Sequence, residues 1–431
     1  MRTKKLLLTI LVIGGLFGGV LLFAGGAQEE GEAPAAEAVK VIRLGAIYPL
    51  TGSAAREGQE SKAVLDLAME VINNPTNLQG IPLAESAGLP NLGGAKIELV
   101  YGDHQGKPEI GRAETERLIT VENVVAMLGS YHSSVTLVAT PVADRYGIPF
   151  LVPDSTNPDI TKQGLTNVFR TTPINDVYVR DAVDMVVDFQ KQQGTNYKRV
   201  AISHDTSVQG KNFHDLLVEA LEKAGFDLIG AVGTKQGSTD VTADVLKLKS
   251  MDPEILFTHH YTAEAILFQE AFKKYQFEPK AVVTVSNAYG LPDFISGAGE
   301  EANYVFVPGT FPPKFIGTQP VTKQVNDMFR QKHGRDMGDG RAFVGLIVLA
   351  EAINRAGSTD ADAIIKALQQ TRFDENQIIM PWKGVEFGPT GENELASITF
   401  QQVLNEQFEI VWPFRLQTAE GVWPAPAFED R

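Results

Sequence analysis

Short apolar runs alternate with stretches of helical periodicity from Val39 onward, and this alternation constrains the fold more than any other feature of the chain. The run Val41–Ile47 predicts a strand. After it, apolar residues follow the i, i+3, i+4, i+7 spacing of one helix face, at Val64, Leu67, Ala68 and Val71. Strands that alternate with helices are typical of βα units, which build a parallel sheet between layers of helices. We therefore predict an α/β protein.

The same alternation continues along most of the chain. Further strands are predicted at Ile97–Tyr101, Val124–Leu128, Pro149–Val152, Arg199–Ser203, Leu228–Val232, Ile255–Thr258 and Ala281–Val285. Helices are predicted at 321–333, 342–356 and 360–370, and alternating apolar residues on either side of Asn405-Glu406 predict a hairpin. Two segments without periodicity, Pro49–Gly58 and Asn73–Gly94, are predicted to be loops, the second of them on the surface.

The chain is too long for a single hydrophobic core, so we expect two domains. A strand-like segment ends near Pro173–Asn175, where we place a first crossover, and a second lies near Val307–Thr310. The prediction is two doubly wound parallel-sheet lobes that are each built from separate parts of the chain. Lobe one comprises 39–173 plus 310–387, and lobe two comprises 174–309 plus 388–431 with the C-terminal hairpin.

The N-terminus has the pattern of a secretory signal. Basic residues at 2, 4 and 5 precede the apolar run Leu6–Phe23, and small residues follow up to Ala27, so we predict a signal peptide over 1–27; an uncleaved membrane anchor is the alternative. Residues 28–38 are acidic and Ala/Pro-rich and are predicted to be a disordered tether. The chain has no cysteine, so Gly25 stands where a lipobox would need one and disulfides are excluded.

Composition and motifs argue against nucleic-acid binding and against several enzyme classes. The formal net charge of −15 disfavours nucleic acid as a partner, because phosphate binding needs a basic surface. Gly210-Lys211 lacks the rest of a P-loop, and no G-x-S-x-G or H-E-x-x-H motif occurs. No cofactor is expected from these motifs. An exported α/β hydrolase or deacylase stays open as one function, and a ligand-sensing receptor module, which would be followed by a transmembrane segment, stays open as another.

Two hydroxyl-rich loops follow consecutive predicted strands. The first, Gly129–Ser134, brings Ser133 and Ser134 to the start of a helical pattern, and the second is Pro153–Asp159. Ligands of open α/β sheets bind at the carboxyl ends of strands, where helix N-termini offer free N–H groups to an anion. Ordinary helix capping is the alternative for each loop taken alone.

At these residues the chain resembles the periplasmic solute-binding proteins of the leucine/isoleucine/valine-binding type, which serve ABC importers. The resemblance extends from Val39 to about Pro413 and rests on the segments Leu44–Gly52, Ile97–Ile119, Gly129–Thr156, Phe169–Asp176 and Val200–Phe213. It implies a type I periplasmic binding fold, in which two lobes joined by three crossovers close on a ligand. It also implies a periplasmic or other extracytoplasmic location and a membrane permease as partner.

The resemblance carries several site residues across. It implies that Ser133 holds the ligand's carboxylate, that Asp154 supplies a backbone contact and that Thr156 supplies a hydroxyl. The chain departs from the family at Gln209, where an aromatic is expected, and near Asn287, where an acid would pair with an amino acid's ammonium. Without that acid a buried ammonium is uncompensated, unless Asp154 replaces it. An amide, a polyol-like solute and a plain carboxylate are the other ligands that these residues allow.

Three further residues are candidates by position. Arg56, in the segment Gly52–Gly58, is able to hold an anion by two hydrogen bonds or to be a solvated side chain. After the predicted strand at 255–258, either His260 or Tyr261 is expected to stack on the ligand. The neighbouring histidines His259 and His260 do not predict a metal site, because adjacent residues of an extended strand point to opposite faces and no third ligand is evident.

Overall fold

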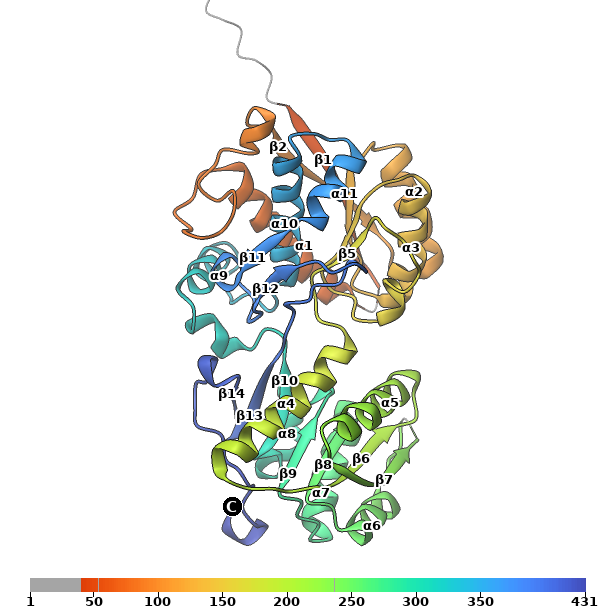
Figure 1. Cartoon of the computed structure of the whole chain (residues 1–431), viewed down its shortest axis with the longest axis vertical. Helices are drawn as coiled ribbons and strands as arrows, with labels where there is room; N and C mark the ends of the chain where they lie inside the picture. Colours follow the sequence, from red (N-terminus) through yellow and green to blue (C-terminus); the bar gives the residue numbers. More distant parts are fainter. Residues whose placement is uncertain (1–39, 53, 236) are drawn as a thin grey trace, which may run out of the picture. The chain divides into compact units, whose positions relative to one another are not determined.

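In the part of the chain that the structure describes, the strands form a five-stranded sheet, a seven-stranded sheet and one small antiparallel pair (Figure 1). The computed structural model describes residues 40–52, 54–235 and 237–431, without the side chains of Arg56, Val208 and Pro292. The predicted signal peptide and tether therefore lie outside the described residues. Within the described ranges, no helix has both the length and the apolar content needed to cross a membrane.

The five-stranded sheet is entirely parallel, as the βα alternation predicts. Its order is β2-β1-β3-β4-β5, and the strands are β1 (Val41–Tyr48), β2 (Lys96–Asp103), β3 (Ala126–Gly129), β4 (Phe150–Val152) and β5 (Val168–Arg170). Apolar side chains on both faces of the strands are buried, which is the requirement for a parallel sheet between two helical layers.

Five helices supply the two covering layers of this sheet, and α9 (Pro320–His333) adds to the same core; together we call these elements lobe one. One face is covered by α1 (Ala55–Asn73), α10 (Arg341–Ala356) and α11 (Ala361–Gln369), and the other by α2 (Pro108–Thr120) and α3 (Ser133–Arg145). Helices from residues 320–369 thus share a core with strands from residues 41–170, so this lobe is built from distant parts of the chain.

The seven-stranded sheet and its helices form lobe two. The sheet order is β14-β13-β10-β9-β8-β6-β7, with β6 (Arg199–Asp205), β7 (Asp227–Thr234), β8 (Ile255–His259), β9 (Ala281–Thr284), β10 (Val305–Gly309), β13 (Thr399–Leu404) and β14 (Gln407–Trp412). The covering helices are α4 (Asn175–Gln193), α5 (Val208–Lys223), α6 (Thr242–Met251), α7 (Thr262–Lys274) and α8 (Pro292–Ala298). This sheet is mixed, because β13 runs antiparallel to both β10 and β14.

The predicted C-terminal hairpin is confirmed as β13 and β14. Asn405 and Glu406 connect the two strands with φ values of 51° and 57°. Positive φ at both central residues is the requirement of the two-residue turn whose twist matches the flanking strands, and asparagine tolerates it better than most residues.

Two sequence-based expectations need correction. Helix α1 begins at Ala55, so residues 55–58 are helical and Arg56 lies in a helix rather than in a loop. The segment 73–94 is packed rather than superficial, because Leu78, Ile81 and Leu89 are buried in the lobe-one core; these residues have no regular period, which hid their burial in the sequence. The predicted second crossover, near Val307–Thr310, includes the end of β10 at Gly309 and stays a prediction.

The small antiparallel pair consists of β11 (Arg372–Asp374) and β12 (Gly384–Glu386). The chain passes between the lobes three times: after β5, after β10, and between β12 and β13. The first and third passages lie together, because the fully buried Arg170 binds Glu392 (Nε to Oε2, 2.9 Å) and Asn393 donates to the carbonyl of Thr171 at 3.0 Å. The predicted residue limits of the lobes stay predictions, and these contacts favour a third crossover that begins after Asn393 rather than at 387.

Candidate ligand-binding site

The loops that follow β3 and β4 meet at Ser133. The Oγ atom of Ser133 accepts a hydrogen bond from the backbone N–H of Asn157 at 3.4 Å. Beneath it, the hydroxyl of Thr136 lies 2.7 Å from that of Ser155 and links the two loops a second time. Tyr131, in the first loop, has a φ of 78°, a conformation that is uncommon for non-glycine residues and that is concentrated at functional sites.

The N-terminus of α3 offers backbone donors to a ligand. The N–H groups of Val135 and Thr136 donate to the carbonyl of His132, both at 3.0 Å. Ser133 and Ser134 come earlier in the first turn, where helix geometry provides no acceptor. Ser133 is half-buried and Ser134 is exposed, so a ligand can reach both residues. Because they lie in the first turn of a helix, their N–H groups point outward as donors of the kind that bind carboxylates.

A buried acid lies in the next loop, at Asp154. Its side chain accepts a hydrogen bond from the Tyr48 hydroxyl at 2.8 Å. The Nε atom of Arg341 lies 3.8 Å from its Oδ1 atom, and Nη1 of Arg341 donates to its backbone carbonyl at 3.1 Å. Burial raises the pKa of Asp154 to about 6, although the charge of Arg341 opposes the rise. Asp154 is therefore mostly ionised at pH 7 and titrates just below it.

Arg341 is a candidate site residue that sequence reasoning missed. It begins α10, and its guanidinium donates to Asp339 at 2.7 Å from Nε to Oδ2. Burial alone would lower the pKa of Arg341, but Asp339 and Asp154 raise it, so the guanidinium stays charged. The sequence pattern could have marked Arg341 as a candidate, since Asp339 precedes a strongly apolar helix whose first residue is an arginine. We call Tyr48, Asp154, Asp339 and Arg341 the Asp154 cluster.

Lobe two contributes aromatic and amide groups opposite this cluster. Asn287, which follows β9, donates from Nδ2 to the hydroxyl of Tyr178 on α4 at 3.2 Å. Burial raises the pKa of Tyr178, and the charge of Arg341 opposes that rise, so the lobe-two tyrosine lies within the field of the lobe-one arginine. The pKa of Tyr131 is likewise raised by burial and lowered by Arg341. The charge of Arg341 thus acts on tyrosines of both lobes.

His259, His260 and Tyr261 have different environments although they are adjacent. His259 binds the buried Asp205 (Nδ1 to Oδ2, 2.8 Å) and stacks on Phe213. His260 is fully buried, with Nε2 at 2.9 Å from Ser203 Oγ, and burial lowers its pKa to about 3. Tyr261 is 41% exposed. Of the two predicted stacking residues, only Tyr261 is accessible to a ligand.

The remaining predicted residues are placed, but no hydrogen bond or ion pair joins them to the Asp154 cluster within the described ranges. Thr156 is half-buried in the loop after β4, and Gln209 is half-buried in the first turn of α5. The side chain of Arg56 lies outside those described. The structure therefore brings Ser133 to the second loop, Asp154 to Arg341 and Asn287 to Tyr178.

Among the described residues of lobe two, Ser203 and His260 form a buried serine–histidine contact, but they are not part of a hydrolytic triad. Ser203 and His260 approach as a nucleophile and a base would, but both are fully buried. A triad would also need an acid on the other nitrogen of the imidazole, and Nδ1 of His260 has no partner because Asp205 binds His259 instead. In the described part of the chain, no three His, Asp or Glu side chains are grouped as metal ligands.

Comparison with protein families and curated proteins gives a consistent result. The family model for the periplasmic binding protein matches residues 41–401. The Leu/Ile/Val-binding protein homolog 7 of Brucella abortus (strain 2308) is 27% identical over 89% of this chain and 94% of its own length. Homolog 8 of the same strain is 23% identical over 86% of this chain and 90% of its own length.

Solved structures share the fold at lower identity. A leucine-binding protein from Thermotoga maritima MSB8 has a TM-score of 0.64 at 22% identity and covers 86% of this chain and 97% of its own. A branched-chain amino acid transporter substrate-binding protein from Streptococcus pneumoniae, in complex with isoleucine, has a TM-score of 0.64 at 19% identity over 86% and 98%. An ABC transporter solute-binding protein from Rhodopseudomonas palustris BisB5, in complex with 3,4-dihydroxybenzoic acid, reaches 0.62 at 16% identity over 91% and 99%. These likenesses establish the two-lobed α/β fold.

Proposed function

Because the chain belongs to the periplasmic binding protein family, we propose that it is an extracytoplasmic solute-binding protein that captures a small solute between its lobes and delivers it unchanged to the permease of an ABC importer. The names of its relatives and the two-lobed fold support this role. The signal-like N-terminus supports export. The proposal includes no chemical conversion of the solute.

We infer that the ligand is a free amino acid with an apolar side chain, of the branched-chain kind named for the relatives. The observation that carries this inference is the composition of the Asp154 cluster, where two carboxyl groups, Asp154 and Asp339, flank the single guanidinium of Arg341. With Asp154 ionised, the cluster carries one surplus negative charge. That charge would compensate a bound ammonium, in place of the acid that is missing at Asn287.

The carboxylate of the same amino acid would bind at the N-terminus of α3. Ser133 and Ser134 offer two hydroxyls and two N–H groups there, and Thr156 would add a hydroxyl from the second loop. Lobe two would then cover the ligand with Tyr178, Asn287, Tyr261 and Gln209, and Arg56 remains a further candidate contact. A ligand held by both lobes stabilises the closed arrangement, because it binds that arrangement better than the open one.

Calorimetry with a panel of matched solutes tests this proposal. L-Leucine, L-isoleucine and L-valine should bind, whereas leucinamide, which lacks the carboxylate, and 4-methylpentanoate, which lacks the ammonium, should bind at least tenfold more weakly. Equal binding of 4-methylpentanoate or of 3,4-dihydroxybenzoate would replace the amino acid with a plain carboxylate. Mass spectrometry of the solute recovered after incubation should find it unchanged, and a converted product would favour the hydrolase alternative.

A further inference from the structure

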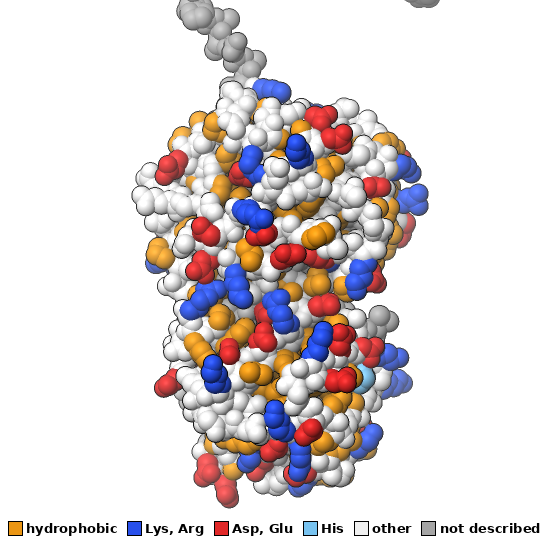
Figure 2. All heavy atoms as spheres, viewed as in Figure 1, with side chains coloured by type: hydrophobic (Ala, Val, Ile, Leu, Met, Phe, Trp, Pro, Cys, Tyr) orange, Lys and Arg blue, Asp and Glu red, His pale blue; other side chains and the backbone are white. Residues whose placement is uncertain are grey.

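A buried arginine at the end of β5 holds the loop that follows β4, which carries Asp154 and Thr156. Over the face drawn in Figure 2, acidic and basic side chains are interspersed at the surface, whereas Arg170 is fully buried. Its Nη1 atom donates to the backbone carbonyls of Ser155 and Asn157, at 3.0 and 2.6 Å. These two carbonyls stand on either side of Thr156, so the guanidinium fixes the backbone at a predicted site residue.

The other donors of Arg170 bind the third crossover and Thr161. The Nε atom donates to Oε2 of Glu392 at 2.9 Å, and Nη2 binds Oε1 of the same glutamate. Nη2 also donates to the Thr161 hydroxyl at 3.0 Å. Five acceptor atoms thus match the five N–H groups of the guanidinium. The backbone makes the same connection, because the N–H of Arg170 donates to the carbonyl of Gly391 at 2.8 Å.

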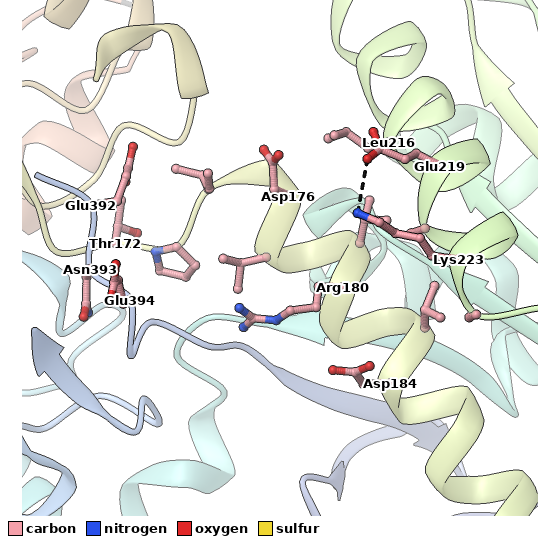
Figure 3. Close-up of a pocket in the computed structure, with 17 residues that line it drawn as sticks. Thr172, Asp176, Arg180, Asp184, Leu216, Glu219, Lys223, Glu392, Asn393 and Glu394 are labelled. Atoms are coloured by element: carbon pink, nitrogen blue, oxygen red, sulfur yellow. Dashed lines mark hydrogen bonds and ion pairs between the residues drawn. The ribbon is translucent and has the colours of Figure 1, made fainter. Parts of the chain in front are cut away.

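Two of the passages between the lobes meet at this network. Arg170 is the last residue of β5, directly before the first passage, and Glu392 lies just before the third begins. Figure 3 draws Glu392 and Asn393 beside Thr172 of the first passage. The side chain of Asn393 donates to the carbonyl of Thr171 at 3.0 Å. The guanidinium therefore connects the loop after β4 to two segments that join the lobes.

Fold stability alone does not require this arrangement. Charged groups are costly to remove from water, and well-packed apolar residues often stabilise a protein as much as a buried ion pair does. An arginine, by contrast, offers a planar set of donors that fixes the surrounding acceptors in one geometry. Arg170 fixes the backbone of residues 155–157 in this way. The same stretch includes the N–H of Asn157, which donates to Ser133 Oγ at 3.4 Å in the first loop.

We propose that Arg170 is a positioning residue for solute binding, which holds the loop after β4 in the shape that presents Thr156 to the ligand, and that Glu392 acts through it. Arg170 is fully buried, so it acts on the ligand only through the loop. Without its donors the loop would adopt several shapes, and the affinity would fall in proportion to the fraction that is competent to bind. The inference rests on the proposed function, because it assumes that the loops after β3 and β4 bind the solute.

Amide hydrogen exchange and calorimetry with L-leucine test the proposal in Arg170→Lys. A lysine keeps the charge but has three donors instead of five and no planar fork, so it cannot hold all the acceptors of the guanidinium in place. The amides of residues 155–161 should exchange about tenfold faster in the apo protein, and L-leucine should bind about tenfold more weakly. Glu392→Gln should show both effects to a smaller extent, and it keeps the proposal testable if Arg170→Lys does not fold.

Arg355→Lys is the matched control. The Arg355 guanidinium also binds a glutamate (Nη2 to Glu351 Oε2, 2.9 Å) and a backbone carbonyl (Nη1 to Ala367, 2.8 Å), but it joins the end of α10 to α11. Arg355→Lys should cost stability without changing the affinity for L-leucine or the exchange of residues 155–161. Each variant is measured at a temperature at which it is folded, so that lost stability is not read as lost affinity.

Full affinity for L-leucine in folded Arg170→Lys would overturn the proposal, and so would unchanged exchange of residues 155–161. An equal loss of affinity in Arg355→Lys would also overturn it, because lost stability would then explain both variants. Absence of L-leucine binding in the parent protein would count against the proposed ligand instead. Exchange in the apo protein would then decide by itself whether Arg170 holds the loop.

Discussion

The guanidinium of Arg341 lies against the buried carboxyl group of Asp154, with 3.8 Å between Nε and Oδ1. The two residues are 187 positions apart in the chain, and Arg341 also binds the backbone carbonyl of Asp154. Burial raises the pKa of Asp154 to about 6 while the charge of Arg341 opposes the rise, so this contact makes the charge of the candidate ligand site depend on pH.

Replacement of Arg341 should raise the pKa of Asp154. In Arg341→Gln the opposing positive charge is gone while the burial remains, so the carboxyl group should titrate above the value of about 6 that it has in the parent protein. Carbon-13 NMR of the Asp154 carboxyl group measures the change. A pKa that is unchanged or lower in Arg341→Gln would mean that the guanidinium does not act on Asp154.

Binding of an amino acid should weaken in acid if Asp154 compensates its ammonium. Only the ionised carboxyl group would bind, so the affinity should be constant above about pH 7 and should fall toward tenfold per pH unit below about pH 6. Asp154→Asn should bind weakly at every pH, and the dependence between pH 7 and 5 should disappear. Calorimetry over this range tests it, and an unchanged pH profile in Asp154→Asn would exclude Asp154 from this role.

Ser133→Ala should weaken binding without unfolding the protein. One hydrogen bond to a charged group contributes about 1.5–3 kcal/mol, so the affinity should fall roughly tenfold to a hundredfold. The only hydrogen bond that Ser133 Oγ makes within the described residues is the long one from Asn157, so the melting temperature should hardly change. Thr156→Val tests the second hydroxyl in the same way. A lowered melting temperature with unchanged affinity would instead support helix capping alone.

Glu392→Gln should destabilise the fold, because it leaves the fully buried Arg170 without its counter-charge. Breaking a buried pair by removing one partner costs about 3–5 kcal/mol of unfolding free energy. The control is Glu98→Gln, which breaks the exposed pair of Glu98 with Arg43 and should cost less than about 1 kcal/mol. Urea unfolding of both variants measures the difference, and equal costs would show that the Arg170 site tolerates an unpaired charge.

His260 should make the folded state sensitive to acid. Burial lowers its pKa to about 3, whereas the unfolded chain binds the proton near the ordinary value of about 6.5. Between these values the unfolded state binds more protons, so the contribution of His260 is full above about pH 6.5 and is lost as the pH falls toward 3.

His260→Gln should therefore lose less stability than the parent protein between pH 7 and 5, as urea unfolding at both values would show. His333→Gln, which changes an exposed histidine of α9, is the control and should lose as much as the parent. Equal losses in His260→Gln and the parent would mean that His260 takes up its proton in the folded state.

Local features of the chain were predictable from its sequence. Strand and helix periods are properties of neighbouring residues, so most elements of both lobes could be predicted from the sequence. The same is true of the hairpin turn at Asn405-Glu406 and of the position of Ser133 at the start of a helix. The βα alternation also implied the parallel sheet of lobe one, because parallel strands require crossovers. The buried but aperiodic segment 73–94 could not be recognised, since its burial depends on α1 and α10 rather than on its own pattern.

Which charged groups meet in the candidate site and at the crossovers was decided by tertiary structure. Arg341 reaches Asp154, and Glu392 reaches Arg170, across 187 and 222 residues of chain, and no local pattern encodes such distances. The same holds for the choice between His260 and Tyr261, because the packing of Phe268 against His260 buries one ring and leaves its neighbour exposed. The sequence by itself determined which residues form strands and helices. The order of the strands and the packing of the helices decided which charged side chains meet, because side chains are buried and paired only between segments that the fold brings together.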